Sequence, residues 1–483
     1  MTARHLNNLV DGQFVDASSG DRIEVADPST AGAVVGSVPS MSAADLGPVF
    51  DAAARGAKTW RAADGLARGA VLLAAARIMR ERAEELRDTI VAELGKTRAD
   101  AAGEVEKSAQ FLEFYGGMGR DEFGGLLHDG REHTVAMRIV EPLGVVVLIT
   151  PWNDPLLTPC RKLGPALISG NAVVIKPATV TPLIVLKLAE ILHEAGLPAG
   201  VLGTVTGRGG EIGDALLEHE AVKAVSFTGS TEVGLGLQRQ LAGRNIRIQT
   251  EMGGKNASVI MADADLDVAI PTVAAGAFGQ AGQRCTATSR LLVQREVADR
   301  VRELLAERVR GLVVAPADGE GVTMGPVVDF RAQESIRAHV SRALEEGATV
   351  VARRELEGPA AAEGAFVEPT LLDISTEHEI WRAEVFGPVL GIVEFDTLDE
   401  AIDAVNDSAY GLSSSIFTTS LAASGEFVAA VDTGQVSVNQ PTSGWDIHHP
   451  FGGFKDSGSG YKEQGRVGLE FYTRVKTAAI RTR

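Results

Sequence analysis

The spacing of apolar residues changes along the chain, and each pattern predicts a different kind of element. Residues 8–40 alternate short apolar runs with turn-forming clusters, which indicates β-hairpins at the start of the chain. Residues 42–116 carry apolar side chains at helical spacing among charged residues, which is typical of amphipathic helices. The polar, glycine-containing segment 119–139 interrupts this region, and we expect it to protrude as a hairpin.

Between residues 143 and 250, apolar runs alternate with helical patterns, which predicts βαβ units. Thr181 and Pro182 offer an N-cap and a first helical residue for one of the helices. The region therefore predicts a parallel, doubly wound sheet, with strands at 145–149, 172–175, 203–205, 224–227 and 246–249 and helices near 155–168, 182–195, 211–218 and 231–241.

Polar residues follow three of these strands, at 150–153, 176–179 and 228–234. Ligands of doubly wound sheets bind beyond the carboxyl ends of the strands, where helix N-termini favour anions. The chain has no exact G-x-G-x-x-G motif, and Leu235 stands where a P-loop would have its lysine. Nucleotide binding is thus indicated by topology more than by motif.

A second α/β region is expected at about 254–455, with glycine-rich bends beside isolated carboxylates. The last apolar run, 469–480, predicts a strand that could pair with the 119–139 excursion or with another subunit.

Composition and charge narrow the classes of function. The chain has 483 residues, 45% hydrophobic and 23% charged, which favours an ordinary globular protein of two or three domains. A formal net charge of −18 disfavours partnership with nucleic acids and anionic membranes. The N-terminus shows no apolar signal segment and no apolar run reaches membrane-spanning length, so we expect a cytoplasmic protein.

Cys285 is the candidate nucleophile, because it lies among small, polar and cationic residues. A thiol reacts as its thiolate, and nearby positive charge such as that of Arg284 and Arg290 lowers a thiol pKa. The alternative is an inert buried cysteine. The only other cysteine, Cys160, lies far away in sequence, which excludes a disulfide framework and a cysteine-based zinc site.

Seven motifs occur in the order and at the spacing of one known family, and over essentially its whole length the chain resembles the NAD(P)-dependent aldehyde dehydrogenase superfamily. The motifs are P-W-N at 151–153, K-P at 176–177, F-T-G-S at 227–230, E-x-G-G-K at 251–255, G-Q-x-C at 282–285, E-x-F-G-P at 384–388 and P-F-G-G-x-K at 450–455.

The resemblance implies a three-part α/β fold and an oligomer. We expect a doubly wound cofactor-binding domain at 1–118 and 140–253, an α/β catalytic domain at 254–455, and a small β oligomerisation arm at 119–139 and 456–483. The arm would make the protein a homodimer or homotetramer.

The resemblance also implies the chemistry, which is oxidation of a small aldehyde to a carboxylate. Cys285 would attack the aldehyde carbon to give a thiohemiacetal. The Asn153 amide and the backbone N–H of Cys285 would hold its oxyanion. Hydride transfer to the nicotinamide leaves a thioester, and Glu251 would activate the water that hydrolyses it. Asn153 in an Asx turn and Glu251 as a solvated carboxylate are the structural alternatives.

NAD or NADP is the implied cofactor. Many NAD-using relatives have a glutamate where this chain has Thr179, and a carboxylate would repel a 2′-phosphate. We therefore expect NADP to be accepted and leave open whether it is preferred. The cofactor-binding residues that the resemblance implies are Thr150, Pro151, Trp152, Lys176, Thr179, Gly209, Thr228, Gly229, Ser230, Gly234, Glu384 and Phe386.

The predicted substrate residues are Arg161, Arg284 and Trp445. Arg161 occupies the position of the carboxylate-binding arginine of succinic semialdehyde dehydrogenases, and the segments 283–290 and 439–442 resemble α-ketoglutaric semialdehyde (2,5-dioxopentanoate) dehydrogenases. Both indicate an ω-semialdehyde acid, since arginine can bond both oxygens of a carboxylate. The alternative for Arg161 is an ion pair with Asp154.

Other interpretations remain open at this point. They are an aromatic or aliphatic aldehyde dehydrogenase of broad specificity, a cofactor-independent thiol esterase using Cys285 and Glu251, and a family member kept as a scaffold. Acylation of coenzyme A is disfavoured by Glu251. We interpret Cys160 as a packing residue and the adjacent His448 and His449 as pocket wall or interface, and we expect no metal.

Overall fold

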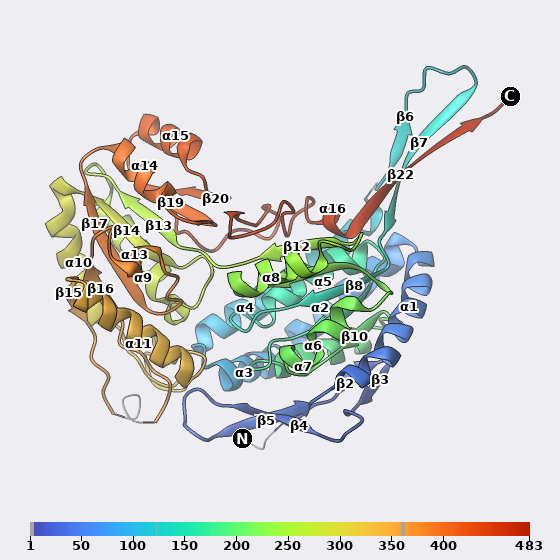
Figure 1. Ribbon diagram of the computed structural model, residues 1–483, viewed down its shortest axis with the longest axis horizontal. Helices are drawn as coiled ribbons and strands as arrows, with labels where there is room; N and C mark the ends of the chain where they lie inside the picture. Colours follow the sequence, from blue (N-terminus) through green and yellow to red (C-terminus); the bar gives the residue numbers. More distant parts are fainter. Residues whose placement is uncertain (1–3, 122, 359–362) are drawn as a thin grey trace.

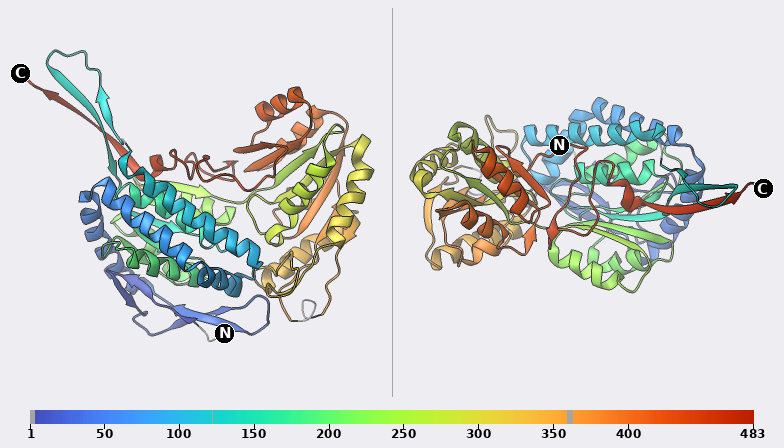
Figure 2. Two further views of the ribbon diagram at one scale, coloured as in Figure 1. Left: turned by 180° about the vertical axis from the view of Figure 1, so that it is seen from behind. Right: turned by 90° about the horizontal axis from the view of Figure 1, so that it is seen from above.

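The computed structural model describes residues 4–121, 123–358 and 363–483. Two α/β lobes face each other, and a thin β arm projects from one of them (Figure 1). The lobe that carries the arm contains the N-terminal half of the chain, and the other lobe is built from residues after the middle of the sequence (Figure 2). The predicted α/β fold class is confirmed, with parallel sheets in both lobes.

The first lobe contains a five-stranded parallel sheet with the order β10-β9-β8-β11-β12. Its buried runs of valine and isoleucine explain why these segments form central strands, since both faces are covered by helices. The strands are β8 (Val145–Ile149), β9 (Ala172–Lys176), β10 (Leu202–Thr204), β11 (Val222–Thr228) and β12 (Arg247–Glu251), and the crossover helices are α5 (Leu157–Ile168), α6 (Leu183–Glu194), α7 (Gly209–Glu218) and α8 (Thr231–Leu241). This is the predicted doubly wound sheet.

The strand order reverses between β8 and β11, which are neighbours in the sheet although two strands separate them in sequence. The chain leaves β8 toward one edge and later returns beside it to continue toward the other edge. Such a switch point opens a crevice beyond the carboxyl ends of its two strands, and ligands of doubly wound sheets bind there. The loops after Ile149 and Thr228 therefore define the place to look for a site.

Helices and hairpins from the N-terminal residues cover this sheet. The helix α4 packs against both α2 and α5, so it lies between the N-terminal helices and the central sheet. The N-terminal elements are β1 (Arg4–His5), β2 (Asn8–Val10), β3 (Gln13–Val15), β4 (Arg22–Ala26), β5 (Val34–Pro39), α1 (Leu46–Ala62), α2 (Gly65–Glu81), α3 (Ala83–Leu94) and α4 (Arg98–Gly117).

The second lobe contains a seven-stranded sheet with the order β15-β16-β17-β14-β13-β19-β20. Within the described residues of this sheet, β15 and β16 are antiparallel and all the other neighbouring strands are parallel. Its strands are β13 (Asn256–Ile260), β14 (Thr288–Gln294), β15 (Thr349–Arg353), β16 (Thr370–Asp373), β17 (Val389–Phe395), β19 (Ser413–Phe417) and β20 (Gln435–Val438). Its helices are α9 (Leu266–Phe278), α10 (Ala298–Arg310), α11 (Phe330–Glu345), α13 (Glu379–Arg382), α14 (Leu398–Asn406) and α15 (Leu421–Ala430), and β18 (Tyr410–Gly411) pairs with β21 (Phe454–Lys455).

The arm is a three-stranded antiparallel sheet of β6 (Gly125–Leu127), β7 (Thr134–Pro142) and β22 (Thr473–Arg481). The C-terminal strand thus pairs with the 119–139 excursion, as one of the two expected pairings had it. The predicted strand 469–480 begins too early, because α16 (Leu469–Tyr472) is a short helical turn. The strand β7 crosses residue 140, the expected boundary between the arm and the cofactor-binding domain. Residues 456–472, which were expected in the arm, lie along the first lobe.

Two further findings concern the helices. The start of α6 differs by one residue from the prediction: Pro182 is the N-cap and Leu183 the first helical residue. Instead of Thr181, the buried carboxylate of Glu93 accepts the backbone N–H groups of Leu183 and Ile184, at 2.9 and 3.0 Å. Among the residues that the structure describes, no helix is long and apolar enough to cross a membrane.

Candidate active site

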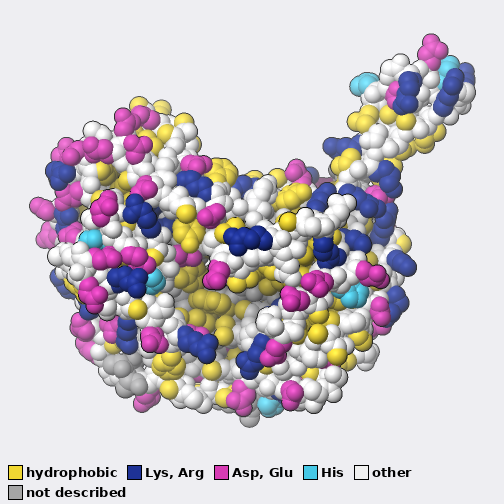
Figure 3. Space-filling model, viewed as in Figure 1, with side chains coloured by type: hydrophobic (Ala, Val, Ile, Leu, Met, Phe, Trp, Pro, Cys, Tyr) yellow, Lys and Arg dark blue, Asp and Glu magenta, His cyan; other side chains and the backbone are white. Residues whose placement is uncertain are grey.

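A cavity of about 730 Å³ lies at the switch point, between the loops after β8 and β11 and the loops of the second lobe. Figure 3 shows hydrophobic side chains gathered in the hollow between the two lobes, with charged side chains around it. Thirteen of the eighteen predicted site residues line this cavity: Thr150, Pro151, Trp152, Asn153, Arg161, Thr228, Gly229, Ser230, Arg284, Cys285, Glu384, Phe386 and Trp445.

Cys285 is half-buried in the loop between a short 3-10 turn (Gly279–Gly282) and β14. Gln280 and Ala281 in that turn have φ angles of 52° and 55°, a left-handed conformation that is uncommon for residues other than glycine. Gly282 lies so close to the loop before β17 that a Cβ there would come within 2.1 Å of the Gly387 carbonyl oxygen. The loop that presents the thiol is therefore fixed by its own backbone.

Burial raises the pKa of the Cys285 thiol to about 12, and the positive charge of Arg161 opposes this effect. The thiol is thus protonated at neutral pH in this state of the protein. A lower pKa requires a proton acceptor or more positive charge near the sulfur. Arg161 can provide such positive charge, because it lines the same cavity.

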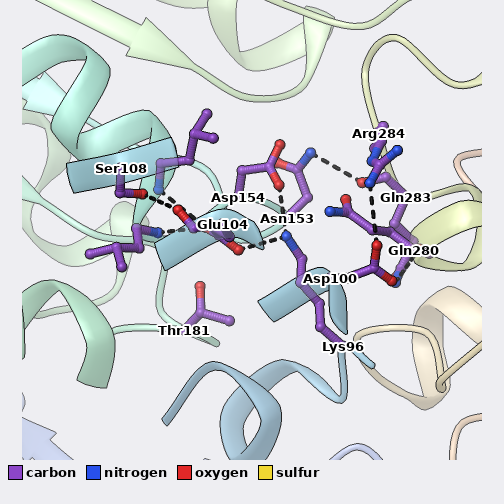
Figure 4. A network of polar contacts seen from close by, with 12 residues as sticks. Lys96, Asp100, Glu104, Ser108, Asn153, Asp154, Thr181, Gln280, Gln283 and Arg284 are labelled. Atoms are coloured by element: carbon purple, nitrogen blue, oxygen red, sulfur yellow. Dashed lines mark hydrogen bonds and ion pairs between the residues drawn. The ribbon is translucent and has the colours of Figure 1, made fainter. Parts of the chain in front are cut away.

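Asn153 lies in the loop that follows β8, and its side chain is buried. Its Nδ2 donates a hydrogen bond to the backbone carbonyl of Gln283, at 3.1 Å (Figure 4). Gln283 is two residues before Cys285, so this bond joins the amide of the first lobe to the nucleophile loop of the second. The predicted oxyanion donor and the predicted nucleophile are therefore brought together.

Glu251 is the last residue of β12, and only 3% of it is exposed. Neither carboxylate oxygen has a hydrogen-bond partner within the described ranges of the chain. The carboxylate lies against Gly452, where a Cβ would come within 2.4 Å of Oε1, and it is not among the residues that line the cavity. Burial, together with the negative charge of Glu463, raises the pKa of Glu251 well above its usual value.

The buried carboxylate of Glu463 was missed by the sequence reasoning. Its two oxygens pair with Arg161 Nε, at 2.8 Å, and with Lys162 Nζ. Lys162 also donates to the hydroxyl of Ser226, at 2.7 Å. A sequence pattern gives no sign of Glu463, because it lies about 300 residues from its partners and precedes a stretch that predicted only a strand.

Arg161 lies on α5, and its guanidinium carbon is 4.5 Å from the centre of the Phe451 ring. The alternative of an Arg161–Asp154 ion pair is wrong, because Asp154 precedes the helix and its Oδ1 pairs with Lys96 Nζ, at 2.7 Å. The carboxylate that pairs with Arg161 is that of Glu463.

Two further cations line the cavity beside Arg161. Arg284 Nη2 lies 3.5 Å from Asp100 Oδ1. Lys107, another residue that the sequence reasoning missed, donates from Nζ to the backbone carbonyl of Trp445, at 2.6 Å. Burial and the charge of Arg161 lower the Lys107 pKa. Lys107 lies on α4, where an amphipathic pattern shows only a charged face, so the sequence held no signal for it.

One end of the cavity lies beside the loops after β8 and β11, where the sequence predicts a nucleotide, and we call it the nucleotide end. Several polar groups there make no hydrogen bond within the described part of the chain and could bind a ligand. The hydroxyls of Thr150 and Thr228 are buried and have no hydrogen-bond partner among the residues described. Ser230 is the N-cap of α8 and lines the cavity, with no capping hydrogen bond from its side chain. The rings of Trp152 and Phe386, which also line the cavity, pack edge to face, with their centres 5.4 Å apart.

Glu384 closes this end from the second lobe. Its Oε1 accepts the backbone N–H of Gly254, at 2.8 Å, and burial raises its pKa to about 7. A Cβ on Gly253 would come within 2.1 Å of Glu384 Oε2, so a larger residue at this position would push the Glu384 carboxylate aside.

Four predicted cofactor residues do not line this cavity. Lys176 ends β9, and its Nζ donates to the Pro177 carbonyl, at 3.2 Å, while burial lowers its pKa to about 8. The Thr179 hydroxyl is 3.5 Å from the Gly207 carbonyl, and Gly209 begins α7. Gly234 is buried in α8, where a Cβ would come within 2.4 Å of the Met252 sulfur.

The remaining residues of interest have structural surroundings. Cys160 is fully buried in the hydrophobic core of the first lobe. His448 and His449 lie side by side, with ring centres 4.4 Å apart, and His448 Nδ1 is 3.5 Å from Asp446 Oδ1. The described part of the chain contains no group of three or more acidic, histidine or cysteine residues that could hold a metal ion.

Comparisons with known proteins find chains that are similar over nearly the whole sequence. The chain is 37% identical over 476 residues to the α-ketoglutaric semialdehyde dehydrogenase of Bacillus subtilis, and the match covers 98% of each chain. It is 36% identical to the NADP(+) succinate-semialdehyde dehydrogenase of Escherichia coli, with 98% of this chain and 97% of that protein covered. The crystal structure of an NAD-dependent aldehyde dehydrogenase from Sinorhizobium meliloti superposes with a TM-score of 0.96 at 34% identity, over 99% of this chain and 95% of that one.

The pattern that defines the aldehyde dehydrogenase family matches residues 14–478, which is nearly the whole sequence. The predicted class of enzyme, an aldehyde dehydrogenase that uses NAD or NADP, is thereby confirmed. The chain belongs to the aldehyde dehydrogenase family.

Proposed function

We propose that this enzyme oxidises an ω-semialdehyde acid, such as 2,5-dioxopentanoate or succinic semialdehyde, to the dicarboxylate. The observation that carries the proposal is the guanidinium of Arg161, which lines the same cavity as the thiol of Cys285 and the amide of Asn153. An arginine binds a carboxylate through two parallel hydrogen bonds. The relatives from Bacillus subtilis and Escherichia coli are named for two such substrates, which supports this assignment.

The contacts of Arg161 leave two of its guanidinium nitrogens able to bind a substrate. Glu463 pairs with the Nε edge, and within the residues that the structure describes no hydrogen bond or ion pair engages the two terminal nitrogens. Phe451 packs on the guanidinium face and holds its plane. A substrate carboxylate would therefore meet a pre-oriented pair of N–H donors while the buried charge stays balanced by Glu463.

Lys107 adds a second positive charge for the same substrate end. Its ammonium bonds only a neutral carbonyl among the described residues, that of Trp445, which itself belongs to the predicted substrate set. The lowered pKa of Lys107 reflects burial and the repulsion from Arg161. An incoming carboxylate offsets that repulsion, so a negatively charged aldehyde is favoured over a neutral one.

We propose that Cys285, Asn153 and Glu251 carry out the steps of the reaction. The Cys285 sulfur would add to the aldehyde carbon as its proton passes to solvent water, and the carbonyl oxygen would become an oxyanion that the Asn153 amide holds. A nicotinamide cofactor, when bound, would supply the acceptor for the hydride that leaves the thiohemiacetal carbon. Glu251, once turned from Gly452 toward the cavity as a carboxylate, takes a proton from the water that cleaves the thioester.

The available polar groups fit a dinucleotide. The α8 N-terminus, at Ser230, presents backbone N–H groups to a pyrophosphate, and the unpartnered hydroxyls of Thr150 and Thr228 lie in the same part of the cavity. Glu384 would bond the nicotinamide ribose. Lys176 and Thr179 would meet the adenosine ribose near the end of β9, and Gly209 and Gly234 would shape the cofactor's flanks.

The absence of a carboxylate at Thr179 favours NADP. A 2′-phosphate next to Thr179 meets a hydroxyl, and Lys176 on the preceding strand supplies positive charge. We therefore propose that NADP is accepted at least as well as NAD.

The arm supports a second copy of this chain as partner. Apolar side chains stand exposed along it, among them Leu126 at 77%, Val475 at 64% and Ile480 at 51% exposed. Exposed apolar strands at a sheet edge favour association. A homodimer or homotetramer built through the arm would bury them.

The test is a panel of aldehydes assayed for NADH and NADPH formation. It compares succinic semialdehyde and 2,5-dioxopentanoate with butanal, pentanal and benzaldehyde. We expect kcat/KM to be roughly 100-fold or more higher for the carboxylated aldehydes, the effect of a charge-assisted pair. Equal or better use of the neutral or aromatic aldehydes would reject the proposed substrate class in favour of broad specificity.

A further inference from the structure

A buried chain of charges lies directly behind the loop that carries Asn153. Lys96, in the turn between α3 and α4, donates from Nζ to Glu104 Oε2 and to Asp154 Oδ1, both at 2.7 Å (Figure 4). The side chains of Lys96 and Glu104 are only 4% and 2% exposed. The charge of Asp154 helps to raise the pKa of Lys96, so the ammonium stays protonated despite its burial.

The second oxygen of Glu104 holds the end of the same loop. Its Oε1 accepts the backbone N–H groups of Leu156 and Leu157, at 2.9 and 3.1 Å. These N–H groups begin α5, whose own N-cap residue, Leu156, offers no capping side chain. A side chain of α4 therefore provides the cap that the local sequence lacks.

Asn153 is thus held from both sides. Asp154, its direct neighbour, is tied to Lys96, and the helix start three residues later is tied to Glu104. The Asn153 amide itself reaches across to the Gln283 carbonyl in the nucleophile loop. A shift of this short segment would move the amide away from the place where the oxyanion forms.

The same helix also contacts the other side of the reaction centre. Asp100, one turn before Glu104 on α4, lies 3.5 Å from Arg284, which immediately precedes Cys285. One helix therefore touches the loop of the oxyanion amide and the loop of the thiol, as Figure 4 shows.

A second buried glutamate provides an internal comparison. Glu93 on α3 likewise caps α6 by accepting two backbone N–H groups, at 2.9 and 3.0 Å, but it uses one oxygen for each, whereas Glu104 accepts both on Oε1. Within the described residues, however, no lysine or arginine forms an ion pair with Glu93, and α6 carries none of the residues that line the cavity. A glutamate can therefore cap a helix without an ion pair to a lysine, so capping of α5 does not explain the presence of Lys96.

We propose that Lys96 is a positioning residue that acts through Glu104 and Asp154 to hold the Asn153 amide at the site of the oxyanion. The inference rests on the proposed role of Asn153 in aldehyde oxidation. Its physical basis is that a displacement of about 1 Å in an oriented group costs roughly 100-fold in rate.

The test is a double-mutant cycle with Lys96→Met and Asn153→Ala, with kcat, KM, cofactor Kd and Tm measured for each variant. We expect Lys96→Met alone to lower kcat by about 10- to 100-fold, with cofactor Kd unchanged. In the Asn153→Ala background the same substitution should change kcat by less than about twofold, because the group it positions is gone.

Two further variants control for stability. Lys96→Met combined with Glu104→Gln removes the more deeply buried of the two charges that lose Lys96, that of Glu104, and keeps the oxygen that caps α5, so this variant should fold even if the single variant does not. Glu93→Gln changes the matched cap of α6, and we expect it to lower Tm while kcat stays unchanged.

The outcomes separate this inference from the function on which it rests. A large loss of kcat in Asn153→Ala with wild-type kcat in the folded Lys96 variants would overturn the positioning role alone. A full loss on top of Asn153→Ala would also overturn it, since Lys96 would then act independently of the amide. Wild-type kcat in Asn153→Ala would overturn the oxyanion role itself.

Discussion

The two ends of the cavity are built by different means. At the nucleotide end, backbone N–H groups and small side chains lie at the carboxyl ends of neighbouring strands β8 and β11 and at the start of α8. At the substrate end, charged side chains meet from distant parts of the chain, as in the Arg161–Glu463 and Lys96–Asp154 pairs. The first end follows from the topology of the sheet, whereas the second depends on individual charges.

This difference predicts which substitutions separate binding of the cofactor from chemistry. The nucleotide end should still bind NAD or NADP when a reacting group is removed. Each charge at the substrate end, in contrast, should have a measurable effect of its own.

The largest effect is expected from Cys285→Ala. The substitution removes the nucleophile for aldehydes and for activated esters alike, so both activities should fall by roughly 10⁴-fold or more. Cofactor binding, followed by quenching of tryptophan fluorescence, should remain within about twofold of wild type because the nucleotide end is untouched. Ester turnover that survives in this variant would show that the thiol is not the nucleophile.

Glu251→Gln should have the next largest effect, and it should act on a single step. Without the general base the thioester accumulates, so a burst of reduced cofactor is expected, followed by a steady-state rate lowered by about 10²- to 10⁴-fold. Rapid-mixing absorbance measurements resolve the two phases. A variant that lost the burst as well would place Glu251 in the first half of the reaction.

The pH dependence of this step has a defined sign. The pKa of Glu251 is raised by burial, so the carboxylate that acts as base becomes more populated as the pH rises, and the steady-state rate of the wild type should increase toward alkaline pH. In Glu251→Gln this rising limb should disappear. A limb that persists unchanged would have to come from another group, such as the Cys285 thiol, whose pKa is also raised by burial.

Thr179→Glu should have the smallest effect, confined to the nucleotide end. A carboxylate near the 2′-phosphate lowers kcat/KM for NADP by about tenfold or more, a repulsion of roughly 1.4 kcal/mol, with little change for NAD. Thr179→Gln is the matched control of equal length without charge. Equal losses with both cofactors would mean that Thr179 does not lie next to the ribose.

The contrast between the two ends also explains which parts of the fold and of the site could be predicted from the sequence alone. The five strands of the cofactor sheet and their helices were predicted because apolar runs and helical periods are local patterns. Motif order then indicated Cys285, Asn153 and Glu251. Lys107 and Glu463 could not be found in this way, because nothing in a single sequence says which distant charges will meet.

The start of α6 shows the same limit on a smaller scale. Thr181 and Pro182 favour a cap from the local sequence, yet the carboxylate of Glu93, about 90 residues earlier, provides it. A buried tertiary contact replaced a local one, and the helix starts one residue later than the pattern predicts.

The most direct test of the substrate assignment compares succinic semialdehyde with butanal, an aldehyde of the same chain length, in the wild type and in Arg161→Leu. We predict that Arg161→Leu raises KM for succinic semialdehyde by roughly 100-fold, as expected for loss of a charge-assisted pair. For butanal, KM should change by less than about threefold. An equal rise in KM for both aldehydes would contradict the account, because Arg161 would then support the site without recognising the carboxylate.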